Sequence, residues 1–189
     1  MFIILEGIDC SGKGFIGEFL LKNLGRSLFI KHGAKPLDSS ELEINKVKNM
    51  YNTMYSIYTD VILPQGKNLL VDRFYPSELV YSKPMRDYEA FEDDYYPVLE
   101  AQIRNNSHDT LIIYVYADEQ ILIDRMQQKG EDFLKPYQIP VILERYGEFI
   151  NNTSLGVLPI KNESSKEEMI WKLKTEIIPK LLESSYGQC

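Results

Sequence analysis

This sequence has few cysteines, no long apolar run and no excess of basic residues, and each of these features excludes a class of protein. Only two of the 189 residues are cysteines, Cys10 and Cys189, so we predict neither a disulfide framework nor a zinc site with four cysteine ligands. No apolar run approaches the roughly 18 residues that a membrane span needs, and residues 1–6 predict a strand rather than a signal peptide. We therefore expect a cytoplasmic protein with no membrane partner.

The charge balance favours a small molecule over a nucleic acid as the partner. With 28 acidic and 21 basic residues the formal net charge is −7, whereas nucleic-acid binding requires clustered Lys and Arg that displace counterions from phosphates. The acidity is equally compatible with a role in solubility alone. The 44% of apolar residues is enough to bury one core, and this length predicts a single α/β domain over residues 1–189.

Strands and helices alternate along the sequence. A short apolar run ends at Gly7, and apolar residues then recur at helical spacing over residues 15–24. This alternation predicts right-handed crossovers and a five-stranded parallel sheet with helices on both faces. The expected strands cover residues 2–6, 28–31, 68–71, 110–117 and 156–160.

Further helices follow from capping signals and periodicity. Ser40 and Ser165 each stand three residues before a glutamate and predict helix starts. A long amphipathic helix follows Ser40 and carries an apolar stripe over residues 47–62, and the acidic, aromatic stretch 87–104 predicts another helix. Pro179 should kink the last helix, because proline lacks the N–H that a helix interior needs.

A glycine-rich segment separates the first strand from the first helix. Residues 7–13 satisfy Gly-x-x-x-x-Gly-Lys, a spacing in which backbone N–H groups surround phosphate oxygens and the lysine reaches the β- and γ-phosphates. An ordinary glycine-rich turn is the alternative, but the flanking strand and helix favour a phosphate loop. We expect ATP to be held by Gly7, Cys10, Ser11, Gly12, Lys13 and Gly14.

Gly14 departs from that pattern. The motif places Ser or Thr after the lysine to ligate Mg²⁺, and glycine has no hydroxyl. Three interpretations stay open: a carboxylate such as Asp72 holds the metal through water, Ser11 or another hydroxyl takes over, or the protein binds nucleotide without turnover. Because phosphoryl transfer depends mainly on positioning and charge neutralisation, we favour the first.

Two motifs carry a resemblance to a known family. Residues 5–13 resemble the phosphate loop of the thymidylate kinase family, which typically reads Glu-Gly-x-Asp-x-x-Gly-Lys. The family's second motif, Asp-Arg-Tyr-x-x-Ser-x-x-Ala-Tyr, is similar to Asp72, Arg73, Phe74, Ser77 and Tyr81. Weaker collinear matches extend the resemblance over nearly the whole chain, at Leu122, Arg125, Lys129, Gly130 and Tyr146.

The resemblance implies roles for residues of both motifs. In that family the arginine after the aspartate holds the acceptor monophosphate, and an acidic loop residue contacts the sugar 3′-hydroxyl, which places these roles on Arg73 and Asp9. A planar guanidinium suits bidentate phosphate binding, and Asp72 can orient metal-bound water. A surface ion pair is the alternative for Asp72 and Arg73. Ser77 and Tyr81 are expected to contact the substrate, or else to cap a helix and to pack.

Other departures from the family concern catalytic charge. Some members carry an arginine in the phosphate loop where this chain has Cys10. Lids of other members also supply arginine, whereas the lid expected here, over residues 126–138, offers Lys129 and Lys135 with Arg125 at its entrance. Lysine neutralises charge but lacks the bidentate geometry of arginine, so we expect a slower lid, with a merely solvated loop as the alternative.

Base recognition departs from the family as well. The family's Arg-Glu-Pro-Gly segment is replaced by residues 31–36, and the helix that would carry the thymine-reading arginine has none over residues 46–62. Thymine selection is therefore not predicted. Tyr51, Asn52 and Tyr55 on that helix can pair with or stack on a base, although such an aromatic stripe is more often core.

These patterns together predict a P-loop fold and a deoxynucleoside monophosphate kinase that uses ATP and Mg²⁺. Lys13 addresses the donor, and Arg73 addresses an acceptor that already carries a phosphate. A deoxynucleoside kinase with Glu6 as general base on a 5′-hydroxyl is one alternative. A non-catalytic nucleotide-binding protein is another, in view of Gly14 and the lysine-only lid. The resemblance also places a homodimer among the expectations.

Overall fold

The structure, a computed structural model, describes residues 1–32, 36–106, 109–130 and 133–186. Cys189 and residues 131–132 of the expected lid therefore lie outside the described part. Within that part, the strands are β1 (Phe2–Glu6), β2 (Ser27–Lys31), β3 (Asn68–Asp72), β4 (Thr110–Tyr116) and β5 (Gly156–Lys161).

The strands form one parallel sheet in the order β2-β3-β1-β4-β5. The central strand, β1, is buried along its whole length and pairs with β3 and β4, so that Leu5 lies opposite Asp72 and Ile113. The expected five-stranded parallel sheet is thus confirmed. Because parallel strands end at the same edge, the segments that follow β1, β3 and β5 meet there.

Helices fill the crossovers between the strands. Ser40 and Ser165 are N-caps whose side chains accept hydrogen bonds from the backbone N–H groups of Glu43 and Glu168, as their spacing predicts. The described α-helices are α1 (Lys13–Asn23), α2 (Glu41–Ile57), α3 (Tyr75–Arg86), α4 (Tyr95–Asn105), α5 (Glu119–Lys129), α6 (Ile139–Asn152), α7 (Lys166–Lys172) and α8 (Ile178–Tyr186).

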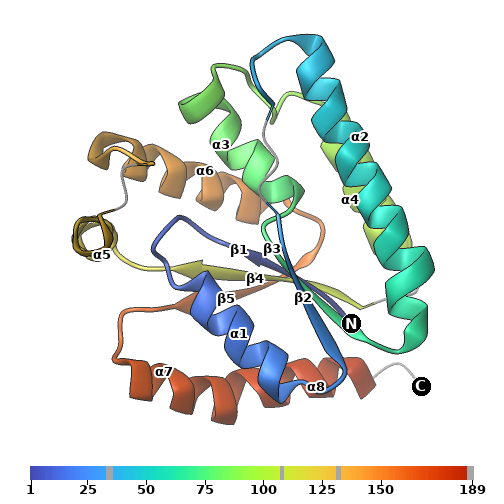
Figure 1. Ribbon diagram of the computed structural model, residues 1–189, viewed down its shortest axis with the longest axis vertical. Coiled ribbons are helices and arrows are strands. Elements are labelled where there is room, and N and C mark those ends of the chain that lie inside the picture. Colours follow the sequence, from blue (N-terminus) through green and yellow to red (C-terminus); the bar gives the residue numbers. More distant parts are fainter. Residues whose placement is uncertain (33–35, 107–108, 131–132, 187–189) are drawn as a thin grey trace.

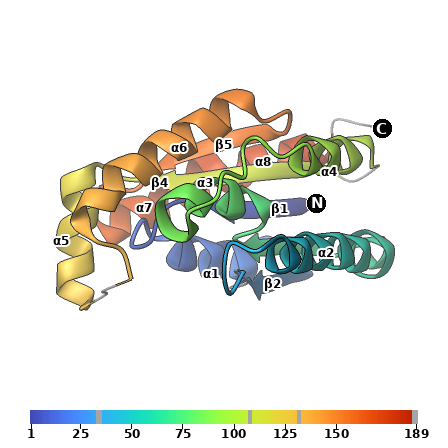
Figure 2. The same ribbon diagram turned by 90° about the horizontal axis from the view of Figure 1, so that it is seen from above.

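The sheet lies between two layers of helices (Figure 1). On one face Ile3 and Leu5 pack with α1, α7 and α8, and on the other face Phe2 and Ile4 pack with α2, α3, α4 and α6. The second view places α2 toward the β2 edge and α6 toward the β5 edge, with α5 beyond the carboxyl ends of the strands (Figure 2). Helices on both faces are therefore confirmed, and the carboxyl edge lies between α3, α5 and α1.

Two local expectations need correction or detail. The helix expected over 87–104 is wrong in its first part, because Asp87 adopts a left-handed conformation (φ 57°) that ends α3, and helix resumes only at Tyr95. A π-helical turn, Leu173–Ile177, interrupts regular α-helix just before Pro179, where the missing N–H cannot continue it. No described helix combines the length and apolarity needed to cross a membrane.

Candidate functional site

The segment between β1 and α1 can form only with glycine at two of its positions. Gly12 has φ 100°, and a Cβ there would lie 2.1 Å from the side-chain amide of Asn162. Gly7 has φ 140°, and a Cβ there would lie 2.0 Å from the carbonyl oxygen of Val115. L-residues with side chains rarely adopt such backbone conformations, and neither position has room for one. The two glycines thus hold the loop close against β4 and β5.

Lys13 points into this loop. Its side chain is 6% exposed, and Nζ donates hydrogen bonds to the carbonyl oxygens of Gly7 (2.7 Å) and Ile8 (3.0 Å). Burial lowers the pKa of Lys13 to about 8, and the neighbouring Arg73 charge acts in the same direction. A buried cation inside a ring of backbone groups at a helix N-terminus suits an anionic group such as a phosphate.

Asn162 holds the loop from the opposite side, and the sequence interpretation does not include it. It follows β5, is 8% exposed, and donates from Nδ2 to the carbonyl oxygen of Ser11 at 2.7 Å. Its only signal in the sequence is its place at the end of a strand in a parallel sheet, where ligand-binding residues collect.

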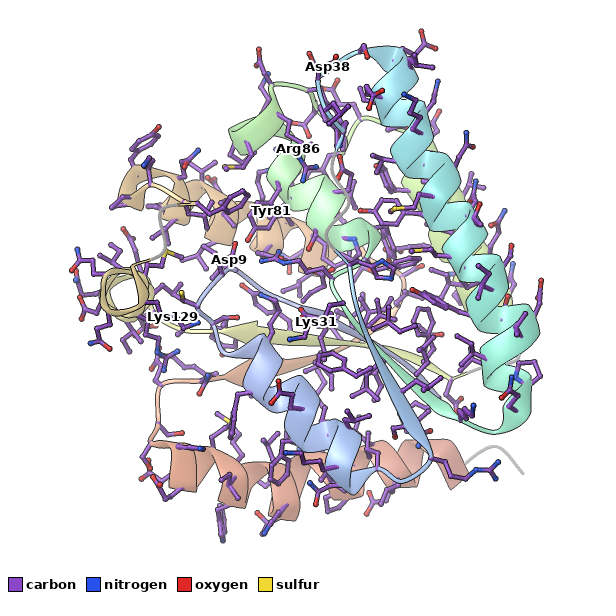
Figure 3. The ribbon with its side chains drawn as sticks, in the orientation of Figure 1. Asp9, Lys31, Asp38, Tyr81, Arg86 and Lys129 are labelled. Carbon is purple, nitrogen blue, oxygen red and sulfur yellow. The ribbon has the colours of Figure 1, made fainter. Side chains whose placement is uncertain are left out.

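A pocket of about 740 Å³ opens over the loop, and cations from several elements line it. Lys31 comes from the end of β2 and Lys129 from α5, on either side of the loop (Figure 3). Nη1 of Arg125 lies 3.4 Å from the carbonyl oxygen of Cys10. The described lining residues are Asp9, Cys10, Gly12, Lys13, Gly14, Phe15, Lys31, Asp72, Arg73, Arg125, Lys129, Asn162, Ser164, Lys166 and Met169.

The residues around Gly14 fit a divalent cation only in part. Oδ1 of Asp72 is buried and has no hydrogen-bond partner among the described residues, which suits a water ligand of Mg²⁺. On the other side, Nζ of Lys31 lies 4.0 Å from the point where a Cβ at position 14 would stand. Ser11, within the loop itself, is fully buried, and its Oγ likewise has no hydrogen-bond partner among the described residues. Within the described ranges no cluster of three or more potential ligands could hold a metal by itself.

Arg73 stands directly after β3 and faces the loop. Its guanidinium donates from Nη2 to Asp9 (2.7 Å) and to the Tyr81 hydroxyl (3.3 Å), and from Nη1 to Ser77 (3.1 Å). Burial acts to raise the pKa of Asp9, but the charges of Arg73 and Lys13 and the hydrogen bonds from Arg73 and Tyr81 together hold that pKa below its usual value. Four of the seven residues expected to contact the substrate, Asp9, Arg73, Ser77 and Tyr81, therefore form one hydrogen-bonded cluster.

Glu6 lies beneath this cluster. Its side chain is fully buried and accepts hydrogen bonds from the backbone N–H of Phe74 (2.9 Å), the Ser77 hydroxyl (2.7 Å) and the Tyr146 hydroxyl (3.0 Å). Burial raises the pKa of Glu6, while the Arg73 charge acts to lower it. The carboxylate thus fixes the turn from β3 into α3.

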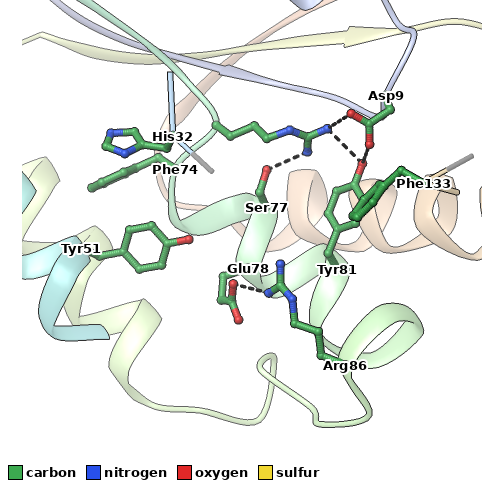
Figure 4. A pocket seen from close by; sticks show the side chains of 10 residues that line it. Asp9, His32, Tyr51, Phe74, Ser77, Glu78, Tyr81, Arg86 and Phe133 are labelled. Carbon is green, nitrogen blue, oxygen red and sulfur yellow. Dashed lines mark hydrogen bonds and ion pairs between the residues drawn. The ribbon is translucent and has the colours of Figure 1, made fainter. Parts of the chain in front are cut away.

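A second, smaller pocket of about 260 Å³ opens on the other side of Arg73 (Figure 4). Asp9 and Arg73 line both pockets. Burial lowers the pKa of His32, whose Nε2 is hydrogen-bonded to the Tyr58 hydroxyl at the pocket wall. The described lining residues are Asp9, His32, Tyr51, Arg73, Phe74, Ser77, Glu78, Tyr81, Arg86 and Phe133.

The far wall of this pocket holds an ion pair that sequence interpretation missed. Glu78 is 1% exposed, and its Oε2 is bonded to Nη1 of Arg86. Burial raises the pKa of Glu78, and the Arg86 charge acts against that rise. Glu78 and Arg86 stand eight positions apart, a spacing that places both side chains on one face of a helix. The sequence alone does not show where α3 begins, and therefore does not show that this face lines the pocket.

Three other predicted residues lie away from both pockets. Asn52 accepts a hydrogen bond from the Tyr95 hydroxyl (3.1 Å), and Tyr55 donates to the carbonyl oxygen of Gln102 (3.2 Å), so both residues contact α4. Lys135 is exposed and follows the part of the lid that is not described. Of the aromatic stripe on α2, Tyr51 reaches the smaller pocket, and the remaining buried members pack in the core.

Comparisons with known proteins identify one relative by sequence and several structures with the same fold. A search of protein-family models gives no match. The chain is 28% identical over 153 residues to the SPbeta prophage-derived uncharacterized protein YorR of Bacillus subtilis (strain 168), covering 81% of this chain and 84% of that protein. The crystal structure of B. subtilis YorR in complex with phosphorylated GDP superimposes with a TM-score of 0.72 at 25% identity, over the full length of both chains.

Two enzymes share the fold at lower identity. Thymidylate kinase from Candida albicans has a TM-score of 0.61 at 16% identity, covering 96% of this chain and 92% of that chain. Deoxyadenosine kinase from M. mycoides has a TM-score of 0.57 at 16% identity, covering 94% and 99% respectively. The fold is therefore that of the P-loop nucleotide kinases.

Proposed function

We propose that this chain transfers the γ-phosphoryl group of ATP to a deoxynucleoside monophosphate. The observation that carries the proposal is the position of Arg73, because its guanidinium lies between two pockets and lines both. A donor in the larger pocket and an acceptor in the smaller one would meet at this residue. A fixed guanidinium between two phosphate-bearing ligands suits a reaction that depends on positioning and charge neutralisation.

Each residue then has a defined task. Lys13 binds the donor phosphates, Lys129 in the lid and Arg125 at its entrance neutralise charge, and Asp72 would orient water around Mg²⁺. When bound, Mg²⁺ would supply positive charge that helps to neutralise the donor phosphates. The remaining tasks fall on the acceptor cluster, in which Arg73 holds the monophosphate, Asp9 the sugar 3′-hydroxyl, and Ser77 and Tyr81 orient the guanidinium.

The geometry around Glu6 favours a monophosphate over a nucleoside as acceptor. A nucleoside kinase needs a general base within reach of the 5′-hydroxyl. Glu6 is fully buried, and both of its oxygens already accept hydrogen bonds: Oε1 from the Phe74 N–H, and Oε2 from the Ser77 and Tyr146 hydroxyls. Arg73, in contrast, offers a cation to a phosphate that the acceptor already carries.

The relatives support a nucleotide as ligand. YorR is described in complex with phosphorylated GDP, and the two enzymes that share the fold are named for phosphoryl transfer to nucleotides or nucleosides. Neither their names nor the fold identifies the acceptor of this chain. The proposal of a monophosphate acceptor therefore rests on the Arg73 cluster.

A coupled assay of ADP formation tests the proposal. With ATP and Mg²⁺, at least one deoxynucleoside monophosphate should stimulate ADP formation, and the corresponding nucleoside should not. Arg73→Lys keeps a charge but loses the planar fork, so kcat/KM for the monophosphate should fall about 10- to 100-fold. The matched control is Arg26→Lys, since Arg26 is an exposed arginine just before β2 that lines neither pocket. ATP binding without turnover on any acceptor would refute the proposal.

A further inference from the structure

The far wall of the smaller pocket holds a hydrogen-bond acceptor and donors side by side, an arrangement that can bind one edge of a planar ring. Glu78 and Arg86 stand there, on the opposite side of the pocket from Asp9 (Figure 4). An acceptor whose phosphate reaches Arg73 would extend its other end toward this wall. Since the inference assigns a base to that acceptor, it rests on the proposed function.

Glu78 has an unused hydrogen-bonding atom in this wall. Its Oε1 is buried and has no hydrogen-bond partner among the residues that the structure describes, whereas Oε2 is bonded to Arg86. A buried acceptor without a donor costs free energy, so its presence in a pocket wall indicates a ligand that supplies the donor. The guanidinium of Arg86, which also lines the pocket, offers donors beside this acceptor.

Aromatic rings complete the walls. Tyr51 and Phe74 pack edge to face with ring centroids 5.2 Å apart, and Tyr81 and the exposed Phe133, a residue of the expected lid, also line the pocket. Aromatic faces bind any base by stacking, and they discriminate poorly among bases. Selection among bases must therefore come from the polar pair.

The four bases present different edges to a carboxylate beside a guanidinium. Guanine offers two adjacent donors, N1–H and the 2-amino group, next to the acceptor O6. Thymine offers one N–H between two carbonyl oxygens, so a carbonyl would face the carboxylate. Adenine and cytosine each offer one amino group beside a ring nitrogen, whose lone pair would face the second carboxylate oxygen. An acceptor-only carboxylate with a donor at its side therefore matches guanine best.

We infer that Glu78 and Arg86 select a guanine base, with the Glu78 carboxylate accepting from N1–H and the 2-amino group and the Arg86 guanidinium donating to O6. The preferred acceptor is then deoxyguanosine monophosphate. Thymidine monophosphate, which the resemblance to thymidylate kinases would suggest, is a poor substrate. Both contacts lie at the base end of the pocket, so they act on the choice of acceptor rather than on the transfer itself.

Calorimetric binding of dGMP and dIMP to the full chain tests the Glu78 contact directly, because the two ligands differ only in the 2-amino group. The native chain should bind dGMP about 10- to 100-fold more tightly than dIMP. In Glu78→Gln this ratio should fall to near one, and in the matched control Glu92→Gln, an exposed glutamate, it should stay unchanged. Equal affinities in the native chain would overturn the inference.

Two further measurements separate this inference from the proposed function. Arg86→Lys keeps the charge beside Glu78 and should reduce the ratio of dGMP affinity to dAMP affinity about 10-fold. This measurement tests the base contacts even if Glu78→Gln fails to fold. Binding that prefers dGMP without any ADP formation would support the base contacts and refute the kinase reaction. ADP formation with dTMP or dCMP as the best acceptor would support the kinase reaction and refute the base contacts.

Discussion

Replacing Glu6 with glutamine separates the two phosphoryl-transfer reactions that the sequence leaves open. If Glu6 were the general base of a nucleoside kinase, its loss should reduce kcat about 10²- to 10⁴-fold. If it only holds the turn after β3, as we propose, the glutamine should keep the hydrogen bond from the Phe74 N–H, and the Ser77 and Tyr146 hydroxyls can turn to accept. The expected change in kcat is then less than about 10-fold.

The stability of this variant follows from the same contacts. Three hydrogen bonds to a charged carboxylate become bonds to a neutral amide, a loss of roughly 1 kcal/mol each, and the removal of a buried charge offsets part of it. We expect a net loss of about 1–2 kcal/mol, or a Tm lower by roughly 2–8 °C.

The pH dependence supplies an internal check on the Glu6 variant. Because burial raises the pKa of Glu6, the folded chain holds this proton more tightly than the unfolded chain, so native stability falls as pH rises from the unfolded to the folded pKa. Glu6→Gln should lack that fall in thermal melts. A loss of kcat above 100-fold in a folded variant with an unchanged Tm would refute our reasoning.

Two further predictions concern the donor side. Nucleotide binding should weaken as pH rises above about 8, by up to about tenfold per pH unit. The reason is that burial lowers the pKa of Lys13 to about 8, and only the protonated amine neutralises phosphate. Titrations with ADP check this, and a Lys13→Met variant with the same pH dependence would contradict it. Gly14→Ser adds the missing hydroxyl and should lower the Mg²⁺ concentration for half-maximal rate about 2- to 10-fold, measured by ADP formation. Adding Lys31→Met to Gly14→Ser should lower this Mg²⁺ concentration further, because Nζ of Lys31 lies 4.0 Å from where a Cβ of residue 14 would stand and its charge repels the metal. An unchanged Mg²⁺ requirement in both variants would exclude a metal beside residue 14.

Residues that lie close together in sequence carry the part of the site that could be predicted. The loop over residues 7–13 and the start of the segment after β3 are set by local spacing, so Lys13 and Arg73 were expected where they lie. Asn162 and Glu78 were not, because their roles depend on which elements meet: Asn162 reaches the loop only through the pairing of β5 with β4. Asn52 is the opposite case, a residue that was predicted to contact the substrate but does not line the pocket. Its side chain lies on the face of α2 that contacts α4.

The connection between the two pockets depends on the backbone at Arg73. This residue adopts a left-handed conformation (φ 70°), which costs a non-glycine residue of order 1–3 kcal/mol and persists only where the surroundings enforce it. Glu6 enforces it by binding the N–H of Phe74, and α3 then begins at Tyr75. Ser77, on the first turn of α3, orients the guanidinium, whereas Arg86 ends the same helix at the far wall. A single helix thus carries residues at both the phosphate end and the base end of the pocket, so substitutions at its far end should change the choice of acceptor without displacing the reacting groups.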